Sequence, residues 1–468
     1  MNKVYIVGAG CGDINLYTLK AINLIKQADC IVYDDLVDHP VLDYCKEEVN
    51  KIYVGKRMHK HSFKQDEINQ ILIDASLKYP ITVRLKGGDP YVFGRGGEEA
   101  LALQKENIAF EVVPGISSCI GGLEMAGIPV THRNISRGFQ VYTSHFENDK
   151  EEPIDFSNMK SDQYTYIFMM SISKLEMIVE GLLSIGKDKK TPIAVVSHAS
   201  LPSQQVLVST LEKIIEDYHH NPLPTPGMIV VGNTVKLQES LDFMKQKPLL
   251  NKKILVSLTQ KDPSFVSALE FYGADVTQIH TGTIEYKAFS IPELKGYFIF
   301  TSQHGVKGFM QQFLLQHDLR ELYNVKFIVV GKKTKEVLES YGIKADYMPS
   351  VYNGASLNKE FKELVKDEGI LFRGNHDSTI TIASKEIEVY ANTPTDIRQL
   401  NEYYDYGLFT SPSSFERFYK VNGDMIDIYI SIGMHTTSMI KKYIKDKNII
   451  TAPVSTKEAM VQVLLEKL

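Results

Sequence analysis

The segment Arg84–Glu99 combines residue types that could bind a ligand and act on it. It contains five glycines, two aromatic residues, three basic residues and three acids. It follows Ile81–Val83, predicted to end a buried strand, and leads into a helix predicted from Glu98 onward. So much glycine in a strand-to-helix connection indicates unusual backbone angles or a close approach of a ligand to the main chain. Because functional loops gather at such strand ends, we predict a ligand site here rather than a simple tight turn.

A second glycine-rich loop, Val7–Asp13, follows the first predicted strand, Val4–Val7. A dinucleotide-binding loop would carry glycine or alanine where Asp13 stands, with its helix opening onto a pyrophosphate. Because a carboxylate there would repel phosphate, we reject an oxidoreductase that uses a dinucleotide. The loop instead suits a ligand without phosphates, such as one with a positive sulfonium.

Composition limits the class of protein. The chain has 468 residues, of which 43% are hydrophobic and 23% charged, values typical of a soluble protein with two or more domains. Its net charge of −5 argues against a general nucleic-acid binder. No membrane-length apolar run and no signal or transit peptide is visible, and the four cysteines form no CxxC pair. These features predict a cytoplasmic protein without membrane or nucleic-acid partners.

Strand and helix patterns divide the chain in two. In the first half strands alternate with helices, which predicts a parallel sheet with crossover helices. A seam near 133–138 indicates two lobes, at about 1–133 and 138–245. A basic, proline-bearing stretch at 245–251 ends this series, and a fresh strand begins at Ile254. The predicted units are therefore 1–245 and 251–468, both of α/β class.

The second half carries an internal echo. Phe300–Val306 resembles Phe409–Phe415, and Val330–Thr334 resembles Ile432–Thr436, at nearly equal offsets. Each is a predicted strand that ends in Thr-Ser or Gly and leads into a helix. Such strand ends can present amides and hydroxyls to an anionic ligand, or the hydroxyls can cap the helices. Because the echoes come in pairs, we favour two similar lobes with a shared cleft.

The N-terminal half, over about residues 1–240, resembles the uroporphyrinogen-III C-methyltransferases of the tetrapyrrole methylase superfamily. The resemblance implies transfer of two methyl groups from S-adenosylmethionine to C2 and C7 of uroporphyrinogen III, which yields precorrin-2. It also implies a two-lobed methylase fold and a homodimer formed through this half. The matching segments, in family order, are Val7–Asp13, Tyr33–Val37, Val54–Arg57, Arg84–Glu99, Val113–Ser118 and Ala126–Arg133, with weaker matches at Met169–Met170, Thr191–Ala194, Pro202–Gln204 and Pro226–Gly232.

The resemblance also implies roles for individual residues. Carbon methylation aligns an electron-rich pyrrole carbon with the sulfonium and removes a proton from the macrocycle. Asp34 is the expected proton acceptor and Lys56 the donor; Arg95 is a rival for the base, although a guanidinium rarely loses its proton. Arg95, Glu98 and Arg133 are expected to face the substrate, whose carboxylates suit bidentate arginine pairing. Cofactor contacts are expected from Cys11, Gly87, Gly88, Asp89, Val92, Ser117, Ser118, Met170 and Ala199.

Simpler interpretations exist for several of these residues. Asp34 could cap the turn after its strand, and Arg95 or Arg133 could form surface ion pairs. The departures from the family pattern bear on cofactor affinity and on one carboxylate contact, and they leave each expected catalytic group in place. They are Cys11 for a usual proline, Ser171 and Ala199 for usual glycines, and Asp35 where relatives often carry a basic residue.

The C-terminal half, residues 251–468, looks like uroporphyrinogen-III synthase, which closes hydroxymethylbilane into uroporphyrinogen III while inverting the last pyrrole. The resemblance implies a bilobal α/β domain, with one lobe from about 251–285 plus 395–468 and the other from about 293–388. It directs Thr334, Tyr390 and Thr436 toward the cleft, with Tyr390 assisting hydroxyl departure. The alternatives are a non-catalytic tetrapyrrole-binding domain and a tyrosine that is merely half-buried. The match rests on Phe298–Ser302, Gly305–Val306, Val330–Thr334, Val389–Tyr390, Phe409–Ser413 and Ile432–Thr436.

Two histidine pairs could suggest a metal. His59 with His61, and His219 with His220, have no acidic or cysteine partner at a suitable spacing, so solvated side chains are favoured. No metal site is predicted, and neither implied reaction requires one.

Overall fold

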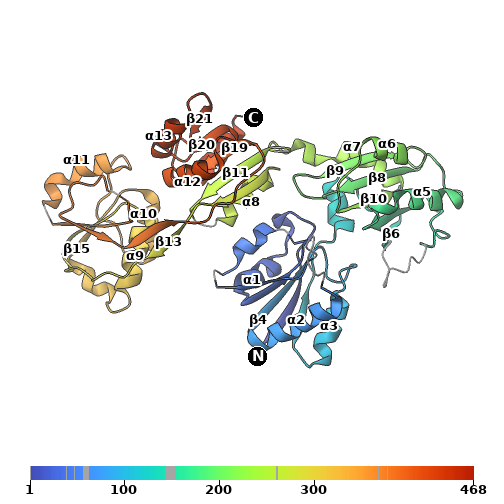
Figure 1. Cartoon of the computed structure of the whole chain (residues 1–468), viewed down its shortest axis with the longest axis horizontal. Coiled ribbons are helices and arrows are strands. Elements are labelled where there is room, and N and C mark those ends of the chain that lie inside the picture. The colour runs from blue at the N-terminus through green and yellow to red at the C-terminus, as the bar shows by residue number, and fades with distance from the viewer. Residues whose placement is uncertain are drawn as a thin grey trace.

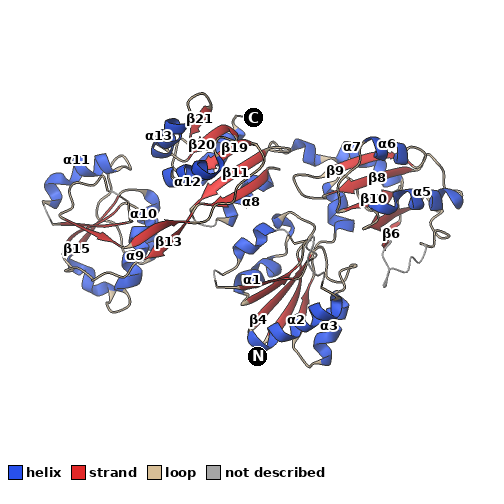
Figure 2. Ribbon diagram, viewed as in Figure 1, coloured by secondary structure: helices blue, strands red, loops and turns tan. Residues whose placement is uncertain are grey.

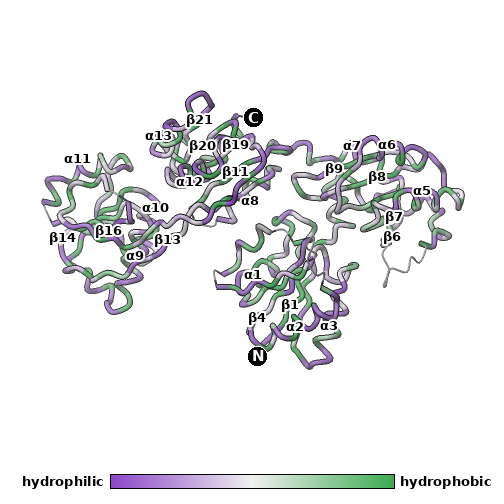
Figure 3. Tube along the Cα trace, viewed as in Figure 1, coloured by the Kyte–Doolittle hydropathy of each residue, from purple (hydrophilic) through white to green (hydrophobic). Residues whose placement is uncertain are grey.

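The computed structural model describes residues 2–37, 39–46, 48–55, 63–143, 154–259, 262–366, 368–376 and 378–467. Within these residues, four larger sheets and one two-stranded ribbon are arranged along the chain, with helices on the sheets (Figure 1, Figure 2). None of the helices described is both long and apolar enough to cross a membrane. In Figure 3 hydrophobic stretches follow the sheets, and every residue of the inner strand β8 (Pro192–Ser197) is buried.

The N-terminal sheet is parallel throughout, in the order β3-β2-β4-β1-β5. Crossover helices return the chain to the same end of the sheet, so every strand runs the same way, as predicted. Both faces bury apolar side chains: Ile6 and Leu72 belong to the core cluster on one side, and Val7 and Ile25 to the one on the other. The elements are β1 (Lys3–Gly8), η1 (Ile14–Leu16), α1 (Leu19–Gln27), β2 (Cys30–Tyr33), η2 (His39–Tyr44), β3 (Asn50–Tyr53), α2 (Gln65–Lys78), β4 (Ile81–Lys86), α3 (Gly96–Lys105) and β5 (Phe110–Val113).

The glycine-rich connection is shorter than predicted. Strand β4 continues three residues past Val83, to Lys86, and α3 begins at Gly96. Arg84 and Lys86 are charged, but both are buried and paired with Glu99, which lets the strand continue. The connection is therefore the nine residues between Lys86 and Gly96.

The second sheet is mixed, in the order β6-β7-β10-β8-β9. The prediction of a parallel sheet holds here for only one pair of strands, β6 and β7. The other neighbouring pairs are antiparallel, so the prediction is wrong for them. The link from β8 to β9 is a short loop, and parallel neighbours need a crossover of a dozen or more residues. The elements are η3 (Ser118–Gly122), α4 (Leu123–Met125), β6 (Gly138–Thr143), β7 (Tyr164–Met169), η5 (Ile172–Lys174), α5 (Leu175–Ser184), β8, β9 (Gln205–Thr210), α6 (Ile214–His220), β10 (Gly227–Val231), η6 (Asn233–Leu237), α7 (Gln238–Leu241) and η7 (Phe243–Gln246).

The C-terminal half forms two parallel sheets, β12-β11-β19-β20-β21 and β15-β14-β16-β17. The chain passes between them twice, and the two crossing strands β13 and β18 pair antiparallel as a ribbon (Figure 1). The first sheet draws on both ends of this half and the second on its middle. The elements are β11 (Lys253–Leu258), α8 (Pro263–Phe271), β12 (Asp275–His280), β13 (Gly282–Tyr286), β14 (Gly296–Phe300), α9 (Gln303–Phe313), η8 (Leu319–Asn324), β15 (Val325–Val329), α10 (Lys332–Ser340), α11 (Gly354–Val365), β16 (Gly369–Arg373), β17 (Lys385–Glu388), β18 (Tyr390–Pro394), β19 (Tyr404–Phe409), α12 (Pro412–Asn422), β20 (Ile426–Ser431), α13 (Met434–Tyr443), β21 (Asn448–Thr451) and α14 (Lys457–Leu465).

The echoed Thr-Ser pairs end strands and begin helices in both lobes of this half. Ser302 caps α9 by accepting a hydrogen bond from the Gly305 amide, and Ser411 caps α12 by accepting one from the Ser414 amide. Both serines therefore satisfy the first helical amides, the simpler of the two roles considered from the sequence.

Close backbone contact at the ends of β1 and β5 yields a test of the fold. A Cβ on Gly8 would lie 2.5 Å from the Gly115 amide nitrogen and 2.7 Å from the Gly88 carbonyl oxygen, and neither main-chain atom can rotate away. We expect Gly8→Ala to lower the free energy of unfolding by about 1–3 kcal/mol, the usual cost of overpacking. Urea denaturation of the full chain measures this change, as a shift of the first unfolding transition.

Gly97→Ala is the matched control, because nothing lies within 4 Å of a Cβ built there. It is the second residue of α3, a position where alanine is a good helix former, so no loss of stability is expected. Equal stability of Gly8→Ala and the unaltered chain would contradict the packing described at this strand end.

Candidate functional site

The two glycine-rich loops after β1 and β4 and the loop after β5, which contains Gly115, meet at one edge of the N-terminal sheet. Gly10 and Gly88 form an antiparallel bridge, with N–O distances of 3.2 and 2.6 Å. Beside it, Gly8 and Gly115 are in backbone contact. The carboxyl ends of parallel strands are where open α/β sheets bind ligands. The two loops singled out in the sequence thus belong to one candidate site.

Asp89 holds this loop junction together. Its Oδ2 accepts a hydrogen bond from the Gly115 amide at 3.1 Å, and its Oδ1 accepts one from the Tyr91 amide at 2.9 Å. Ser117 lies beside Gly88: a Cβ on that glycine would be 3.8 Å from the Ser117 Cα. Gly88, Asp89 and Ser117 are therefore brought together, and the Asp89 carboxylate fixes the shape of the loops.

The loop after β8 brings the second lobe to the same site. The Ser200 hydroxyl donates to the Cys11 carbonyl at 2.8 Å and accepts from the Asp13 amide at 3.3 Å. On either side of Ala199, His198 and Ser200 have φ values of 47° and 69°, a conformation costly for non-glycine residues that is found most often at functional sites. The first glycine-rich loop is thereby tied to a strained loop of the second lobe.

Two glycines of η3 identify the side chains that surround this junction. A Cβ on Gly121 would lie 3.4 Å from the Cys11 Sγ, and one on Gly122 would lie 2.8 Å from the Ala199 Cβ and 3.3 Å from the Ser118 Cβ. Val92, Cys119 and Ala199 pack in one apolar cluster. The residues expected to bind a cofactor that lie around the junction are Cys11, Gly88, Asp89, Val92, Ser117, Ser118 and Ala199.

The other two residues expected to bind the cofactor are Gly87, which directly precedes Gly88, and Met170. Gly87 is against Leu36, whose Cβ would be 2.6 Å from a Cβ on that glycine. Met170 follows the last residue of β7, is 44% exposed and has a φ of 55°. Gly87 is thus adjacent to the turn that carries Asp34.

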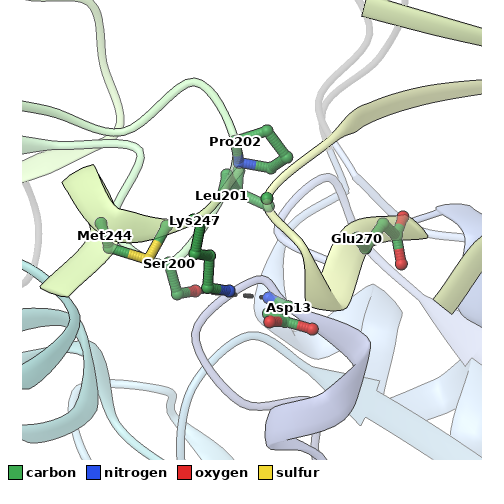
Figure 4. A pocket seen from close by; sticks show the side chains of 8 residues that line it. Asp13, Ser200, Leu201, Pro202, Met244, Lys247 and Glu270 are labelled. Carbon is green, nitrogen blue, oxygen red and sulfur yellow. Dashed lines mark hydrogen bonds between the residues drawn. The ribbon is translucent and has the colours of Figure 1, made fainter. Parts of the chain in front are cut away.

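A pocket adjoins Ser200 on the side of the C-terminal half. Figure 4 shows Asp13 and Ser200 joined by their hydrogen bond, with Met244 and Lys247 nearby and Glu270 of α8 across from them. The pocket is therefore lined by the first glycine-rich loop, the second lobe, the linker and the C-terminal half.

The two halves also touch beside this pocket. The Ser267 hydroxyl of α8 donates to the Asn15 side-chain oxygen at 2.8 Å. The Gln278 amide of β12 donates to Asp43 Oδ2 at 3.2 Å. Contacts from α8 and β12 thus hold the C-terminal half against the N-terminal lobe.

Asp34 follows the last residue of β2 and faces the same sheet edge. Its Oδ2 accepts a hydrogen bond from Arg84 Nη2 at 3.0 Å, and its Oδ1 accepts one from the Leu36 amide at 3.2 Å. Its side chain is 25% exposed. The carboxylate thus stabilises its own turn, as the simpler interpretation held, and also pairs with a buried arginine.

Arg95 and Glu98 form a bidentate ion pair at the start of α3, with distances of 2.8 and 2.7 Å. Both side chains are 48% exposed, and the arginine hydrogen bonds lower the pKa of Glu98. Arg133 is exposed in the loop that leads to β6. The surface ion pair considered from the sequence is thus present at Arg95. The expected proton donor, Lys56, lies outside the described residues.

Three charged residues behind the site were missed in the sequence. Arg84, Lys86 and Glu99 are 2%, 5% and 0% exposed, and both cations pair with Glu99. The available signal was the alternation of Arg84 and Lys86 in an otherwise apolar strand, which places both side chains on one face. The strand was instead predicted to end at Val83, so this signal was lost.

In the C-terminal half, Tyr390 lies beside two polar side chains. Its hydroxyl is 3.0 Å from the Ser302 Oγ, and its ring centroid is 5.5 Å from that of His304. Tyr390 is 4% exposed, and burial raises its pKa, so its hydroxyl remains a proton donor at neutral pH. Thr334 and Thr436 are buried near the starts of α10 and α13, in different lobes, and no described contact joins them to Tyr390.

Among the described residues, no group of three His, Cys, Asp or Glu side chains gathers as a metal site would require. His219 is exposed at the end of α6 and pairs with Glu176 at 3.3 Å. His59 and His61 lie outside the described residues.

Comparison with known proteins assigns each half. Residues 3–215 match the model of the tetrapyrrole (corrin/porphyrin) methylases, and residues 264–462 match that of uroporphyrinogen-III synthase HemD. A uroporphyrinogen-III C-methyltransferase from Methanocaldococcus jannaschii is 48% identical over 240 residues, which are 51% of this chain and 98% of the relative. The structure of uroporphyrin III C-methyl transferase from Thermus thermophilus is 36% identical with a TM-score of 0.44, over 50% of this chain and 100% of that one.

One relative spans both halves. The porphyrin biosynthesis protein HemD from Ruminiclostridium josui is 32% identical over 496 residues, which cover 99% of this chain and 97% of the relative. Both resemblances noted in the sequence are thereby confirmed. The chain belongs to the tetrapyrrole methylase family in its N-terminal half and to the uroporphyrinogen-III synthase family in its C-terminal half.

Proposed function

We propose that the chain is a bifunctional enzyme of tetrapyrrole biosynthesis. Its C-terminal half closes hydroxymethylbilane into uroporphyrinogen III, and its N-terminal half methylates that product at C2 and C7 to precorrin-2. The observation that carries the proposal is the meeting of three strand-end loops, through Gly10, Gly88 and Gly115, beside the Asp34 turn. The full-length relative in which the same two halves are joined supports the pairing of activities.

S-adenosylmethionine fits the junction of these loops. The strand ends approach so closely that glycine is required at Gly8, and the small side chains of Cys11, Ser118 and Ala199 lie around Gly121 and Gly122. Such a cradle lets backbone amides contact an adenosyl group, and Asp13 disfavours a phosphate. A uroporphyrin-III C-methyl transferase from Thermus thermophilus has been solved with S-adenosyl homocysteine. When bound, S-adenosylmethionine supplies a methyl group on a positively charged sulfur.

The residues at the open side of the site would bind and deprotonate the macrocycle. Asp34 accepts the proton that the macrocycle loses once its ring carbon is methylated, with Lys56 as donor. Arg95 and Arg133 bind substrate carboxylates, and Glu98 orients Arg95 until a carboxylate takes its place. Arg95 is the weaker candidate for the base because it holds its proton too tightly.

In the C-terminal half, Tyr390 would donate a hydrogen bond or proton to the departing hydroxyl. Burial keeps its phenol protonated, and Ser302 fixes its orientation. His304 lies against it and is neutral at physiological pH, so it would not repel the cation left by hydroxyl loss. The alternative is a C-terminal half that binds tetrapyrrole without catalysis. A homodimer through the methylase half and a cytoplasmic location complete the proposal.

Two substitutions should separate the activities, because Asp34 and Tyr390 stand on different sheets. With hydroxymethylbilane and S-adenosylmethionine, Asp34→Asn should lower methylation by about 10²-fold or more, the usual contribution of a general base, and leave cyclisation intact. Tyr390→Phe should lower cyclisation and leave methylation of supplied uroporphyrinogen III intact. Chromatographic separation of type I and type III isomers and of methylated products measures both.

The matched controls are Asp74→Asn and Tyr323→Phe, both exposed and distant in sequence from either site. Type I product alone, from the unaltered chain without S-adenosylmethionine, would eliminate the synthase activity and favour the binding-domain alternative. Undiminished methylation by Asp34→Asn would assign the base elsewhere.

The neutral state of His304 predicts a pH dependence of stability. Burial lowers its pKa to about 4, with a smaller contribution from Lys307, whereas histidine in an unfolded chain titrates near about 6.5. Between these values the unfolded chain binds a proton that the folded chain does not, so this stability is present above about pH 6.5 and lost as pH falls toward 4. Thermal unfolding from pH 7.5 to 4.5 should therefore show His304→Gln losing less stability than the unaltered chain. His376→Gln, at an exposed histidine, is the control, and a constant difference across this range would contradict the buried neutral state.

A further inference from the structure

Four charged side chains meet behind the open side of the methylase site. Arg84 and Lys86 of β4 and Glu99 of α3 have side chains that are 3%, 6% and 0% exposed, and Asp34, at 25%, is their exposed member. Two cations and two carboxylates balance one another. Burial of charges costs several kcal/mol per ion unless they are paired and hydrogen-bonded, so each depends on its partners.

The sheet register explains why these residues meet. β2 and β4 are neighbours, and Val32 stands opposite Arg84. Asp34 is two residues beyond Val32, and Lys86 is two residues beyond Arg84. Because side chains along a strand alternate between its two faces, Asp34, Arg84 and Lys86 are directed toward the same face as Val32. Helix α3 covers that face, with Glu99 in its first turn.

The guanidinium of Arg84 is fixed by all three of its nitrogens. Nε donates to Glu99 Oε1 at 3.1 Å, Nη1 to the Leu85 carbonyl at 2.7 Å and Nη2 to Asp34 Oδ2 at 3.0 Å. A planar guanidinium held in this way presents one donor in a single orientation. The Asp34 carboxylate is thus oriented by Arg84 on one oxygen and by the Leu36 amide on the other.

Glu99 in turn holds both cations. Its Oε1 also accepts from Lys86 Nζ at 2.7 Å, while its buried Oε2 has no hydrogen-bond partner among the described residues. Burial and the charge of Arg84 lower the pKa of Lys86, and Glu99 opposes that shift. Burying the Glu99 carboxylate with one oxygen unpaired costs free energy. This cost indicates that the orientation of Arg84 serves a purpose other than packing.

We propose that Arg84 is a positioning residue for methyl transfer, which sets the orientation of the Asp34 carboxylate toward the macrocycle, and that Glu99 and Lys86 hold Arg84 in place. The inference rests on the proposed function of Asp34 as proton acceptor. A purely structural cluster would stabilise the packing of α3 on β4 and affect every step alike. A positioning role instead acts through Asp34 and on turnover.

A double-mutant cycle on the full chain separates these roles. Arg84→Met and Arg84→Lys are compared in the unaltered and the Asp34→Asn backgrounds, with kcat and KM for methylation, the Kd for S-adenosylmethionine and the unfolding temperature measured for each. We expect Arg84→Met to lower kcat by about 10- to 100-fold, as misplacement of a catalytic group by about 1 Å does, with KM and Kd within about twofold. Arg84→Lys keeps the positive charge but loses the planar guanidinium, so its kcat should lie between those of the unaltered chain and of Arg84→Met.

In the Asp34→Asn background, Arg84→Met should change kcat by less than about twofold, because residues that act as a unit are not additive. If Arg84→Met lowered kcat by the same factor in both backgrounds, or left kcat unchanged, the positioning role would be overturned. An unaltered chain that does not methylate would overturn both this inference and the proposed function. A kcat loss for Arg84→Met that is present in the unaltered background and absent in the Asp34→Asn background is the expected result and supports both.

Arg84→Met leaves Glu99 with one cation and could prevent folding. The double variant Arg84→Met/Glu99→Gln removes one charge of each sign and keeps the cluster balanced, and it should fold and show the same dependence on Asp34. Arg320→Met, at a side chain that is 90% exposed in the C-terminal half, is the control for loss of an arginine.

Discussion

The methylase half depends on the contact of main chains where β1, β4 and β5 end. Gly8, Gly88 and Gly115 meet there without side chains between them, which brings three loops within hydrogen-bonding distance of one another. Asp89 then joins two of these loops through backbone amides. Everything proposed for the methyl donor follows from this contact, because a ligand enclosed by backbone needs no large side chains around it.

A second constraint acts behind the same edge. Charged residues in a central strand cost free energy unless their partners are buried with them, and Arg84, Lys86 and Glu99 supply those partners. The cluster opens toward solvent at Asp34, which carries the expected proton chemistry. In the C-terminal half, the proposed proton donor is Tyr390, whose hydroxyl pairs with that of Ser302 at a strand end. Burial keeps the neighbouring His304 neutral.

The arrangement of the two halves gives the proposed pair of reactions a physical basis. Each has its own sheets and core clusters, so loss of one site need not disturb the other. They nonetheless meet, through Ser267 with Asn15 and Gln278 with Asp43, next to the loop that carries Asp13. The pocket in Figure 4 lies at this junction.

Sequence by itself determined the α/β class, the two glycine-rich loops at strand ends and both family memberships, because glycine runs, strand periodicity and ordered motifs are local properties of the chain. It could not determine the end of β4, the mixed pairing of the second sheet or the partners of Arg84. Those depend on which strands become neighbours and on which charges find a buried counter-charge, and both require residues far apart in the chain to meet. The register that sets Val32 opposite Arg84 brings Asp34 to its arginine, and only the tertiary structure decides that.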